Sequence, residues 1–160
     1  MAGAPEVAAG TLTIPHPYPE GAAEAWIAGH AAAAERGEAI QLAIERREDG
    51  ALVGAIGLEL ERGHDRAELG YWVGVPYWGS GYATEAAAAV LRYAFEVERL
   101  NRVFAYHFTD NPASGRVLQK LGMTHEGRRR GHYRKGGRYL DGEAYAILRD
   151  EWEAARAGVS

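Results

Sequence analysis

Residues Glu68 to Phe95 read ELGYWVGVPYWGSGYATEAAAAVLRYAF, and this stretch decides the fold. Its first residues predict an apolar strand that ends at Pro76, because proline lacks the N–H that a strand ladder needs. A turn with two glycines follows, and Thr84–Glu85 opens an alanine-rich run that predicts a long helix. A glycine turn at a helix N-terminus favours an anion, because free backbone amides and the helix dipole both attract negative charge. We therefore interpret Gly79–Thr84 as a pyrophosphate cradle, with an ordinary strand–turn–helix corner as the alternative.

The glycines Gly79 and Gly81 flank Ser80 and let the backbone fold tightly with its amides pointing one way. Two common phosphate motifs do not fit this turn. A dinucleotide fingerprint needs a third glycine where Thr84 stands, and a P-loop needs a lysine that the stretch lacks. The predicted phosphate site is therefore of another kind.

Two segments carry a resemblance to a known family. Trp78–Ala83, WGSGYA, resembles the acyl-CoA pyrophosphate loop of the GNAT N-acyltransferases, whose pattern is Arg/Gln-x-x-Gly-x-Gly/Ala. Gly81 and Ala83 fit this pattern, and Trp78 replaces the usual Arg or Gln. Asn111–Met123, NPASGRVLQKLGM, is similar to the second signature of the Rim-type branch, the ribosomal-protein N-terminal acetyltransferases and their relatives. Two motifs in the right order are more specific than either alone.

Composition limits the class of protein. The chain has 160 residues, which suits one domain with a real core, and its net charge of −4 argues against a general nucleic-acid binder. No run is apolar for long enough to cross a membrane, and the N-terminus lacks signal-peptide features, so a cytosolic location is the default expectation. The chain has no cysteine, so an acyl-cysteine intermediate is impossible and direct attack by the acceptor is the simplest route for acyl transfer.

Periodicity and turn residues predict a single domain over residues 1–160, of mixed α/β (α+β) class, with residues 1–19 extended or irregular. The predicted strands are 40–45, 52–60, 67–73, 102–108, 123–134 and 138–148, with a turn at 62–65. The predicted helices are 20–36, 82–98, 112–121 and a short tail at 150–155. The resemblance implies the GNAT fold, a central mixed, mostly antiparallel sheet flanked by helices, which splays between the family's fourth and fifth strands to admit the cofactor. That family has a further strand ahead of the point where this chain starts, so we expect the first strand to be missing and a sheet edge to be uncovered or covered by a partner.

The resemblance also implies the residues that hold the acyl donor, acetyl-CoA. Loop amides would bind the pyrophosphate, the strand end would pair with the pantetheine arm, and a backbone N–H there would face the thioester oxygen. The expected donor contacts are Trp72, Val73, Val75, Trp78, Gly79, Ser80, Gly81, Tyr82, Ala83, Thr84, Asn111 and Ser114.

The residue that deprotonates the amine is left open by the sequence. The family often uses a Glu, but Tyr106 and Tyr133 stand at the corresponding positions, and neither is a convincing base at neutral pH. The local candidates are Glu68 and His107, each with a structural alternative, and His132 stands behind them. Proton transfer to water is a further alternative.

The leaving thiolate needs only a mild acid, since a thiol has a reference pKa of roughly 8.5. The resemblance places Ser114 near the sulfur of coenzyme A, and the alternative is a hydroxyl in the first turn of a helix. Asn111 is expected to touch the pantetheine arm, with an N-cap as its alternative. The expected acceptor-binding aromatics are Tyr18, Trp26, Tyr71 and Tyr133, although core packing explains Tyr71 and Trp26 equally well.

The leading hypothesis is an N-acetyltransferase that passes an acetyl group from acetyl-CoA to a small-molecule amine or to a protein N-terminus. No metal is expected, because the histidines lack ligand spacing, and no membrane partner is expected. A homodimer is a further hypothesis. The first rival is a non-catalytic module of the same fold that binds coenzyme A. The second is an interaction or RNA-binding protein that uses the basic residues of the last hairpin, against which the net acidity counts. Those residues are Arg128, Arg129, Arg130, Arg134, Lys135 and Arg138.

Overall fold

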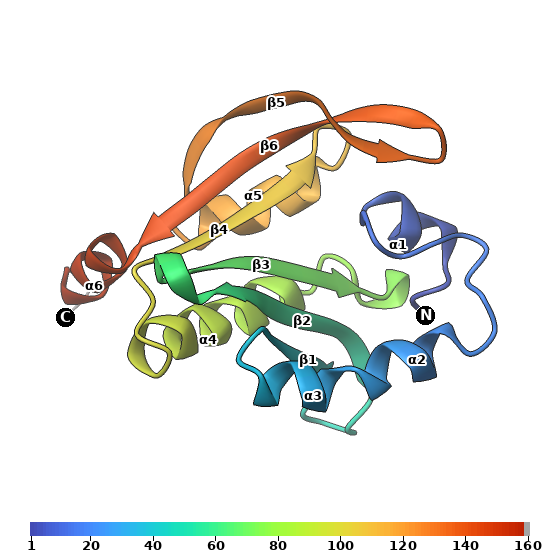
Figure 1. Cartoon of the computed structure of the whole chain (residues 1–160), viewed down its shortest axis with the longest axis horizontal. Helices are drawn as coiled ribbons and strands as arrows, with labels where there is room; N and C mark the ends of the chain where they lie inside the picture. Colours follow the sequence, from blue (N-terminus) through green and yellow to red (C-terminus); the bar gives the residue numbers. More distant parts are fainter. Residues whose placement is uncertain (159–160) are drawn as a thin grey trace.

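The computed structural model describes residues 1–158, and a single six-stranded sheet runs through it (Figure 1). The strand order is β1-β2-β3-β4-β6-β5, and every neighbouring pair is antiparallel except β3 and β4. The strands are β1 (Ala39–Glu45), β2 (Leu52–Glu61), β3 (Arg66–Val73), β4 (Arg102–Phe108), β5 (Thr124–Lys135) and β6 (Arg138–Leu148). The helices are α1 (Pro5–Ala9), α2 (Ala22–Ala28), α3 (His30–Glu35), α4 (Tyr82–Glu96), α5 (Pro112–Lys120) and α6 (Arg149–Ala157). This architecture confirms the mixed, mostly antiparallel sheet flanked by helices that the sequence predicts.

Helix α4 is the main packing partner of the sheet. Its buried residues are Ala87, Val90, Leu91, Ala94 and Phe95, at the spacing of one helical face. They join a core built from side chains of β2, β3 and β4. The small alanines let the helix lie close to the strands, and this fixes its N-terminus at the carboxyl end of β3.

The sheet opens between β3 and β4. These parallel strands pair over three residues only, from Arg66↔Arg102 to Glu68↔Phe104. Beyond Glu68 the strands diverge, and β4 pairs on its other side, along its whole length, with Gly142–Leu148 of β6. The opening corresponds to the splay that the family resemblance implies, and it leaves the second half of β3 accessible from the side of α5.

The predicted helix at 20–36 is wrong as a single element. It is divided into α2 and α3 at Gly29, where a residue of low helix propensity lies between two short helical runs. Neither piece has a buried residue, and Trp26 and Ile27 are 44% and 60% exposed. The alanine-rich composition therefore forms helix without an apolar face packed on the core.

The N-terminal segment is not uniformly extended. Helix α1 forms there, with a proline in its first turn and with Val7 and Ala8 buried. Lys135, near the tip of the β5–β6 hairpin, donates hydrogen bonds from Nζ to the carbonyl oxygens of Ala8, Thr11 and Ile14, the last at 3.3 Å. Figure 1 shows α1 beside the end of this hairpin. One side chain thus ties the beginning of the chain to its last hairpin.

The first strand of the structure is β1, and it lies at the edge of the sheet. No strand occurs among residues 1–38, which form α1, α2, α3 and the segments that join them. Within residues 1–158, no helix is long and apolar enough to cross a membrane.

Candidate functional site

Two adjoining cavities lie where the sheet opens. The turn cavity, of about 630 Å³, lies beside the glycine turn and the N-terminal ends of α4 and α5. The sheet cavity, of about 570 Å³, lies over the open faces of β2, β3 and β4, beneath the N-terminal segment. The residues that line both cavities are Gly10, Thr11, Tyr71, Trp72 and Ser114. A molecule in one cavity can therefore meet a molecule in the other at these five residues.

The glycine turn is shaped for close approach by a ligand. Gly79 and Gly81 have φ values of 74° and 84°, in the left-handed region that favours glycine. A Cβ atom added to either residue would meet nothing within 4 Å, so the space above the turn is free. Gly81 is also the N-cap of α4, and no side chain accepts a hydrogen bond from the first backbone amides of this helix. The free amides of this helix start therefore face room for an anion.

Most of the expected donor contacts line the turn cavity. Those that do are Trp72, Val73, Trp78, Gly79, Gly81, Tyr82, Ala83, Thr84, Asn111 and Ser114. Val75 and Ser80 do not line it. Val75 lies instead in the short 3₁₀ turn Val75–Tyr77, where its carbonyl accepts a bond from the N–H of Trp78. The indole Nε1 of Trp78 donates to the carbonyl oxygen of Val73 at 2.7 Å, so the residue that replaces the family's Arg or Gln ties the turn to the end of β3.

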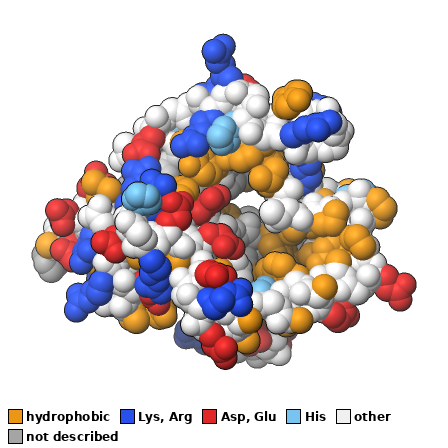
Figure 2. Space-filling model, viewed as in Figure 1, with side chains coloured by type: hydrophobic (Ala, Val, Ile, Leu, Met, Phe, Trp, Pro, Cys, Tyr) orange, Lys and Arg blue, Asp and Glu red, His pale blue; other side chains and the backbone are white. Residues whose placement is uncertain are grey.

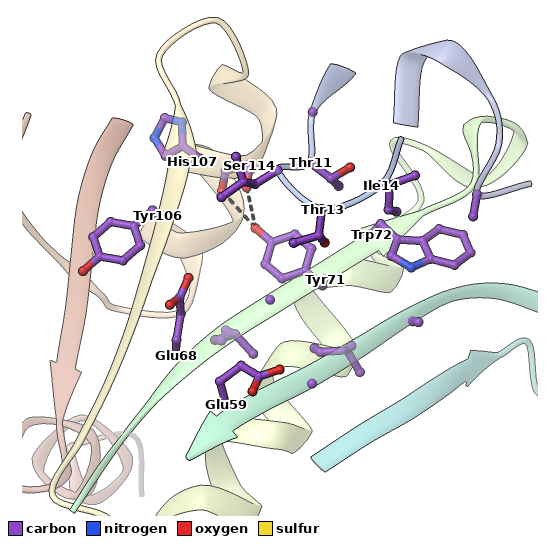
Figure 3. Close-up of a pocket in the computed structure, with 18 of the residues that line it drawn as sticks. Thr11, Thr13, Ile14, Glu59, Glu68, Tyr71, Trp72, Tyr106, His107 and Ser114 are labelled. Carbon is purple, nitrogen blue, oxygen red and sulfur yellow. Dashed lines mark hydrogen bonds between the residues drawn. The ribbon is translucent and has the colours of Figure 1, made fainter. Parts of the chain in front are cut away.

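Two polar side chains at the start of α5 lie at the junction of the cavities. Asn111 is the N-cap, and its Oδ1 accepts a bond from the backbone N–H of Ser114 at 3.4 Å. The Ser114 Oγ lies 2.9 Å from the hydroxyl oxygen of Tyr71, which also donates to the Ser114 carbonyl oxygen at 3.2 Å (Figure 3). Burial raises the pKa of Tyr71 to about 12, so its phenol stays protonated at neutral pH. Tyr71 can therefore act as a hydrogen-bond donor to Ser114.

The sheet cavity brings together all of the expected acceptor and base residues except His132. Tyr18, Trp26, Tyr71, Tyr133, Glu68 and His107 all line it. Figure 2 shows this side of the molecule hollowed between the hairpin and the N-terminal segment, with hydrophobic side chains along the walls. Segments far apart in the sequence, from the N-terminal segment to β5, supply the walls, so the cavity exists only in the folded protein.

Glu68 points from β3 toward the sheet cavity (Figure 3). The residue is exposed overall, yet burial of part of its carboxyl group raises its pKa, and Glu59 and Glu61 add to the shift. Arg129 opposes the shift. A carboxylate with a raised pKa is a better proton acceptor than an ordinary surface glutamate.

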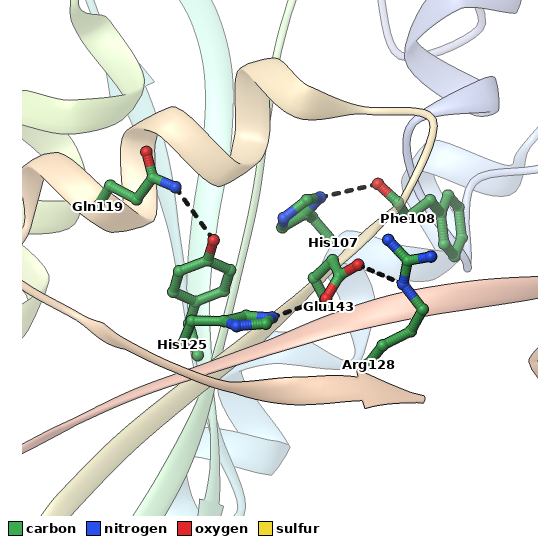
Figure 4. A network of polar contacts seen from close by, with 7 residues as sticks. His107, Phe108, Gln119, His125, Arg128 and Glu143 are labelled. Carbon is green, nitrogen blue, oxygen red and sulfur yellow. Dashed lines mark hydrogen bonds and ion pairs between the residues drawn. The ribbon is translucent and has the colours of Figure 1, made fainter. Parts of the chain in front are cut away.

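His107 is held differently. It is buried, and its Nδ1–H donates to the carbonyl oxygen of Phe108 at 2.7 Å (Figure 4). The other ring nitrogen, Nε2, faces α5, where a Cβ atom placed on Gly115 would lie 2.7 Å away. The glycine of the second motif thus lets α5 sit directly on the imidazole ring. Nδ1 of His107 is therefore held by a hydrogen bond, and Nε2 lies against α5.

The two tyrosines that stand where the family often has a glutamate both line the sheet cavity. The rings of Tyr106 and Tyr133 contact each other with centroids 6.2 Å apart. Burial, followed by the charge of Glu68, raises the pKa of Tyr133. Within residues 1–158, the hydroxyl oxygen of Tyr133 has no solvent-exposed surface and no hydrogen-bond partner. The oxygen is therefore enclosed by protein, although Tyr133 itself lines the cavity.

Several lining residues are absent from the sequence-based prediction. In the turn cavity these include Arg116 and Lys120, an i, i+4 pair on α5 whose spacing within the second motif already places them on one helical face. In the sheet cavity they include Thr11 and Glu59. The signal for Glu59 lies in the turn at 62–65, because a hairpin folded about that turn sets Glu59 opposite Glu68.

The basic hairpin is partly neutralised by its own neighbours. Arg128 Nε pairs with Glu143 Oε1 at 2.7 Å, and His125 Nε2 contacts the other oxygen of the same carboxylate (Figure 4). These two partners lower the pKa of Glu143. Arg129 stacks over the ring of Tyr106, 4.5 Å from its centroid. Among residues 1–158, no group of three or more His, Asp or Glu side chains is arranged to hold a metal ion.

Comparison with known proteins identifies the family. Residues 1–124 match the acetyltransferase (GNAT) domain family. Since the match covers more than half of the chain, this protein belongs to the GNAT acetyltransferase family, as the two motifs and the fold predict. The Rim-type resemblance is also confirmed by relatives that carry ribosomal-protein acetyltransferase names.

Three relatives illustrate the likeness. The uncharacterized N-acetyltransferase YoaA of Bacillus subtilis is 39% identical over 111 residues, which cover 69% of this chain and 63% of that protein. The [ribosomal protein uS5]-alanine N-acetyltransferase of Escherichia coli is 30% identical over 88 residues, 55% of this chain and 45% of that protein. The crystal structure of a GNAT-family acetyltransferase from Bacillus anthracis matches with a TM-score of 0.65 at 33% identity, over 69% of this chain and 66% of that one. The chain spans about 60% of the length of the first curated relatives that it matches.

Proposed function

We propose that this protein transfers an acetyl group from acetyl-CoA directly to a primary amine. The observation that carries this proposal is the meeting of the two cavities at Tyr71 and Ser114. One cavity has a helix start and a free glycine turn for a pyrophosphate, and the other has a partly buried carboxylate for an ammonium group. Family membership and the fold support the same reaction class.

The turn cavity is the proposed donor site. The amides of Gly79–Thr84 bind the pyrophosphate, and Arg116 and Lys120 add positive charge for phosphate groups. Trp72 and Val73 line the path from the turn to Ser114, where the pantetheine arm would lie. The open space over Gly79 and Gly81 fits this role, since a backbone without Cβ atoms can approach a diphosphate closely.

The sheet cavity is the proposed acceptor site, and Glu68 is the proposed base. When bound, acetyl-CoA supplies the thioester whose carbon–sulfur bond breaks as the amine nitrogen forms a bond to the acetyl carbon. Glu68 takes the proton that the ammonium group loses. The pKa of Glu68 is raised by burial and by neighbouring carboxylates, which favours this uptake. We prefer Glu68 to His107 because both ring nitrogens of His107 face protein atoms.

Ser114 is the proposed acid. Its hydroxyl donates a proton to the leaving thiolate and takes up in turn the second proton that the attacking nitrogen loses as the amide forms, while Tyr71 holds Ser114 in place through the 2.9 Å contact between the two hydroxyl oxygens. The demand is small, because a thiol has a reference pKa of roughly 8.5. With no cysteine in the chain, no acyl-cysteine step enters this route.

The acceptor is proposed to be a small-molecule amine or a protein N-terminus, and one relative is named for acetylating an alanine of a ribosomal protein. Calorimetric titration with acetyl-CoA and a thiol-release assay with both acceptor classes test the proposal together. We expect micromolar binding of acetyl-CoA and thiol release that depends on an added amine. Binding with no amine-dependent thiol release would contradict catalysis and favour a binding module. The homodimer expected from the sequence stays a prediction, to be checked by sedimentation.

A further inference from the structure

The charges around the sheet cavity are all of one sign. Among its lining residues the carboxylates are Glu59 and Glu68, and the lining contains no lysine or arginine. His107 also lines the cavity, and its ring is held by the carbonyl oxygen of Phe108 and by α5. Arg129, whose charge acts on Glu68, lies outside the lining and stacks on Tyr106.

The two carboxylates face each other across neighbouring strands. Glu59 on β2 and Glu68 on β3 are direct partners in the antiparallel register, so their side chains lie on the same face of the sheet (Figure 3). Directly opposed residues have Cβ atoms roughly 4.5–5.5 Å apart, and like charges at such positions destabilise a sheet. A cation between or beside them would remove this repulsion.

The carboxylates have little internal compensation. The Oε1 atom of Glu59 accepts a hydrogen bond from Gln41 Nε2 at 3.3 Å. In the described part of the chain, neither Glu59 nor Glu68 forms a salt bridge, although Glu61 on the same strand pairs with Arg66. The fold thus neutralises the neighbouring acid and leaves the two in the cavity unpaired.

The rest of the cavity suits an apolar chain with polar ends. Trp26, Trp72 and Tyr106 supply aromatic walls, which favour methylene groups and ammonium groups alike. Tyr133 also lines the cavity, although its hydroxyl oxygen is enclosed by protein.

We propose that the acceptor is a small diamine, with one amino group acetylated beside Glu68 and the second bound, still protonated, by Glu59. This inference rests on the proposed acetyl transfer and narrows its acceptor. Strand β2 is one strand farther from Ser114 than β3 is, so the second ammonium group lies away from the acetyl group. Glu59 is then a specificity-determining residue that selects a dication over an amine with an apolar tail.

The test compares cadaverine with hexylamine, which has the same number of non-hydrogen atoms but a methyl group in place of the second ammonium. The readout is the ratio of the two kcat/KM values in a thiol-release assay with acetyl-CoA. We expect a ratio of roughly tenfold or more in favour of cadaverine for the unmodified chain, and a ratio near one for Glu59→Gln. Glu45→Gln, which removes a carboxylate from β1 outside both cavities, should keep the original ratio.

Transfer to both amines with no preference, or a preference that survives Glu59→Gln, would overturn the inference and leave acetyl transfer intact. A higher kcat/KM for a peptide with uncharged side chains than for cadaverine would also overturn it. If no amine is acetylated, the proposed function fails, and calorimetric titration of the two amines decides the acceptor question alone. Tighter binding of cadaverine that Glu59→Gln abolishes would support the cation site, and equal binding would refute it.

Discussion

The hydroxyl oxygen of Tyr71 lies 2.9 Å from Oγ of Ser114, which joins β3 to α5 across the opening in the sheet. The contact exists because β3 and β4 stop pairing after Glu68, so a side chain on the helix-facing side of β3 reaches α5 directly. Both residues line both cavities. Substitutions at these two residues can therefore show whether turnover depends on the pair separately from binding of the acyl donor.

Ser114→Ala should lower turnover more than donor binding, because it removes the hydroxyl proposed to protonate the leaving thiolate. We expect kcat to fall by roughly tenfold to a hundredfold with the Kd for acetyl-CoA changed by less than about threefold. Steady-state kinetics and calorimetry together measure the two effects.

Tyr71→Phe is the companion change. It removes the hydroxyl that holds the Ser114 side chain and the bond to the Ser114 carbonyl, and we expect a smaller fall in kcat than for Ser114→Ala. Turnover equal to that of the unmodified chain in both variants would remove the proposed acid role.

Gly81→Val should abolish donor binding, because a branched side chain would fill the space over the turn and strain a residue with φ of 84°. We expect the calorimetric signal with acetyl-CoA to disappear. Gly50→Val is the matched control, since Gly50 has φ of 70° and open space but lies in the β1–β2 turn. If Gly81→Val binds acetyl-CoA as well as Gly50→Val does, the turn is not the pyrophosphate site.

Glu68→Gln should lower kcat by roughly a hundredfold and flatten the acidic limb of the rate profile. A base must be deprotonated, and the pKa of Glu68 is raised above its ordinary value, so the rate of the unmodified chain falls as pH drops through that raised pKa. A pH profile of kcat/KM measures the limb. A limb of unchanged shape in the variant would shift the role to water.

The same substitution should raise stability at neutral pH. A carboxyl group whose pKa is higher in the folded state binds its proton more tightly there, so its contribution to stability is lost as pH rises through the folded pKa. Glu68→Gln removes this penalty, and we expect a higher Tm at pH 7 with a smaller difference at pH 4. A lower Tm at pH 7 would contradict the sign of the shift.

His107→Gln should affect stability and leave the acidic limb in place. The ring packs beneath Gly115 and donates to the Phe108 carbonyl, and loss of a buried hydrogen bond with poorer packing costs about 1–3 kcal/mol. Chemical denaturation measures the loss, and the pH profile tests the catalytic role separately. Loss of the acidic limb in this variant would make His107 the base in place of Glu68.

Lys135→Met should loosen the N-terminal segment, because it removes hydrogen bonds to the carbonyls of Ala8, Thr11 and Ile14. Burial lowers the pKa of Lys135, which is consistent with an ammonium group withdrawn from water. We expect higher KM values for both substrates and faster proteolysis near residues 8–14. The exposed neighbour Arg134, changed to Met, provides the control and should show neither effect.

Much of the fold follows from local patterns. The strands Arg102–Phe108 and Arg138–Leu148 have the predicted bounds, and α4 and α5 differ from prediction only at their C-terminal ends. In these elements the apolar period, the glycines and the helix-start residues all agree. The single helix predicted over 20–36 fails because alanine content favours helix everywhere and does not reveal the break at Gly29.

In the candidate site too, the part that depends on local sequence could be predicted and the part that depends on distant contacts could not. The donor contacts sit in two short motifs, and their positions follow from one turn and one helix start. The sheet cavity depends on contacts between distant segments, such as Thr11 with the faces of β2 and β3, which no local pattern specifies. Glu59 could have been predicted from the sequence, because a hairpin folded about the turn at 62–65 places it opposite Glu68.

The N-terminal segment has a consequence for how acceptor choice can change. Gly10 and Thr11 border both cavities, so a substitution there that alters the preferred amine also alters affinity for the acyl donor. Tyr18, Trp26 and Glu59 border the sheet cavity alone. Substitutions at Tyr18, Trp26 or Glu59, in the laboratory or in evolution, can therefore change which amine is accepted without changing the affinity for the acyl donor.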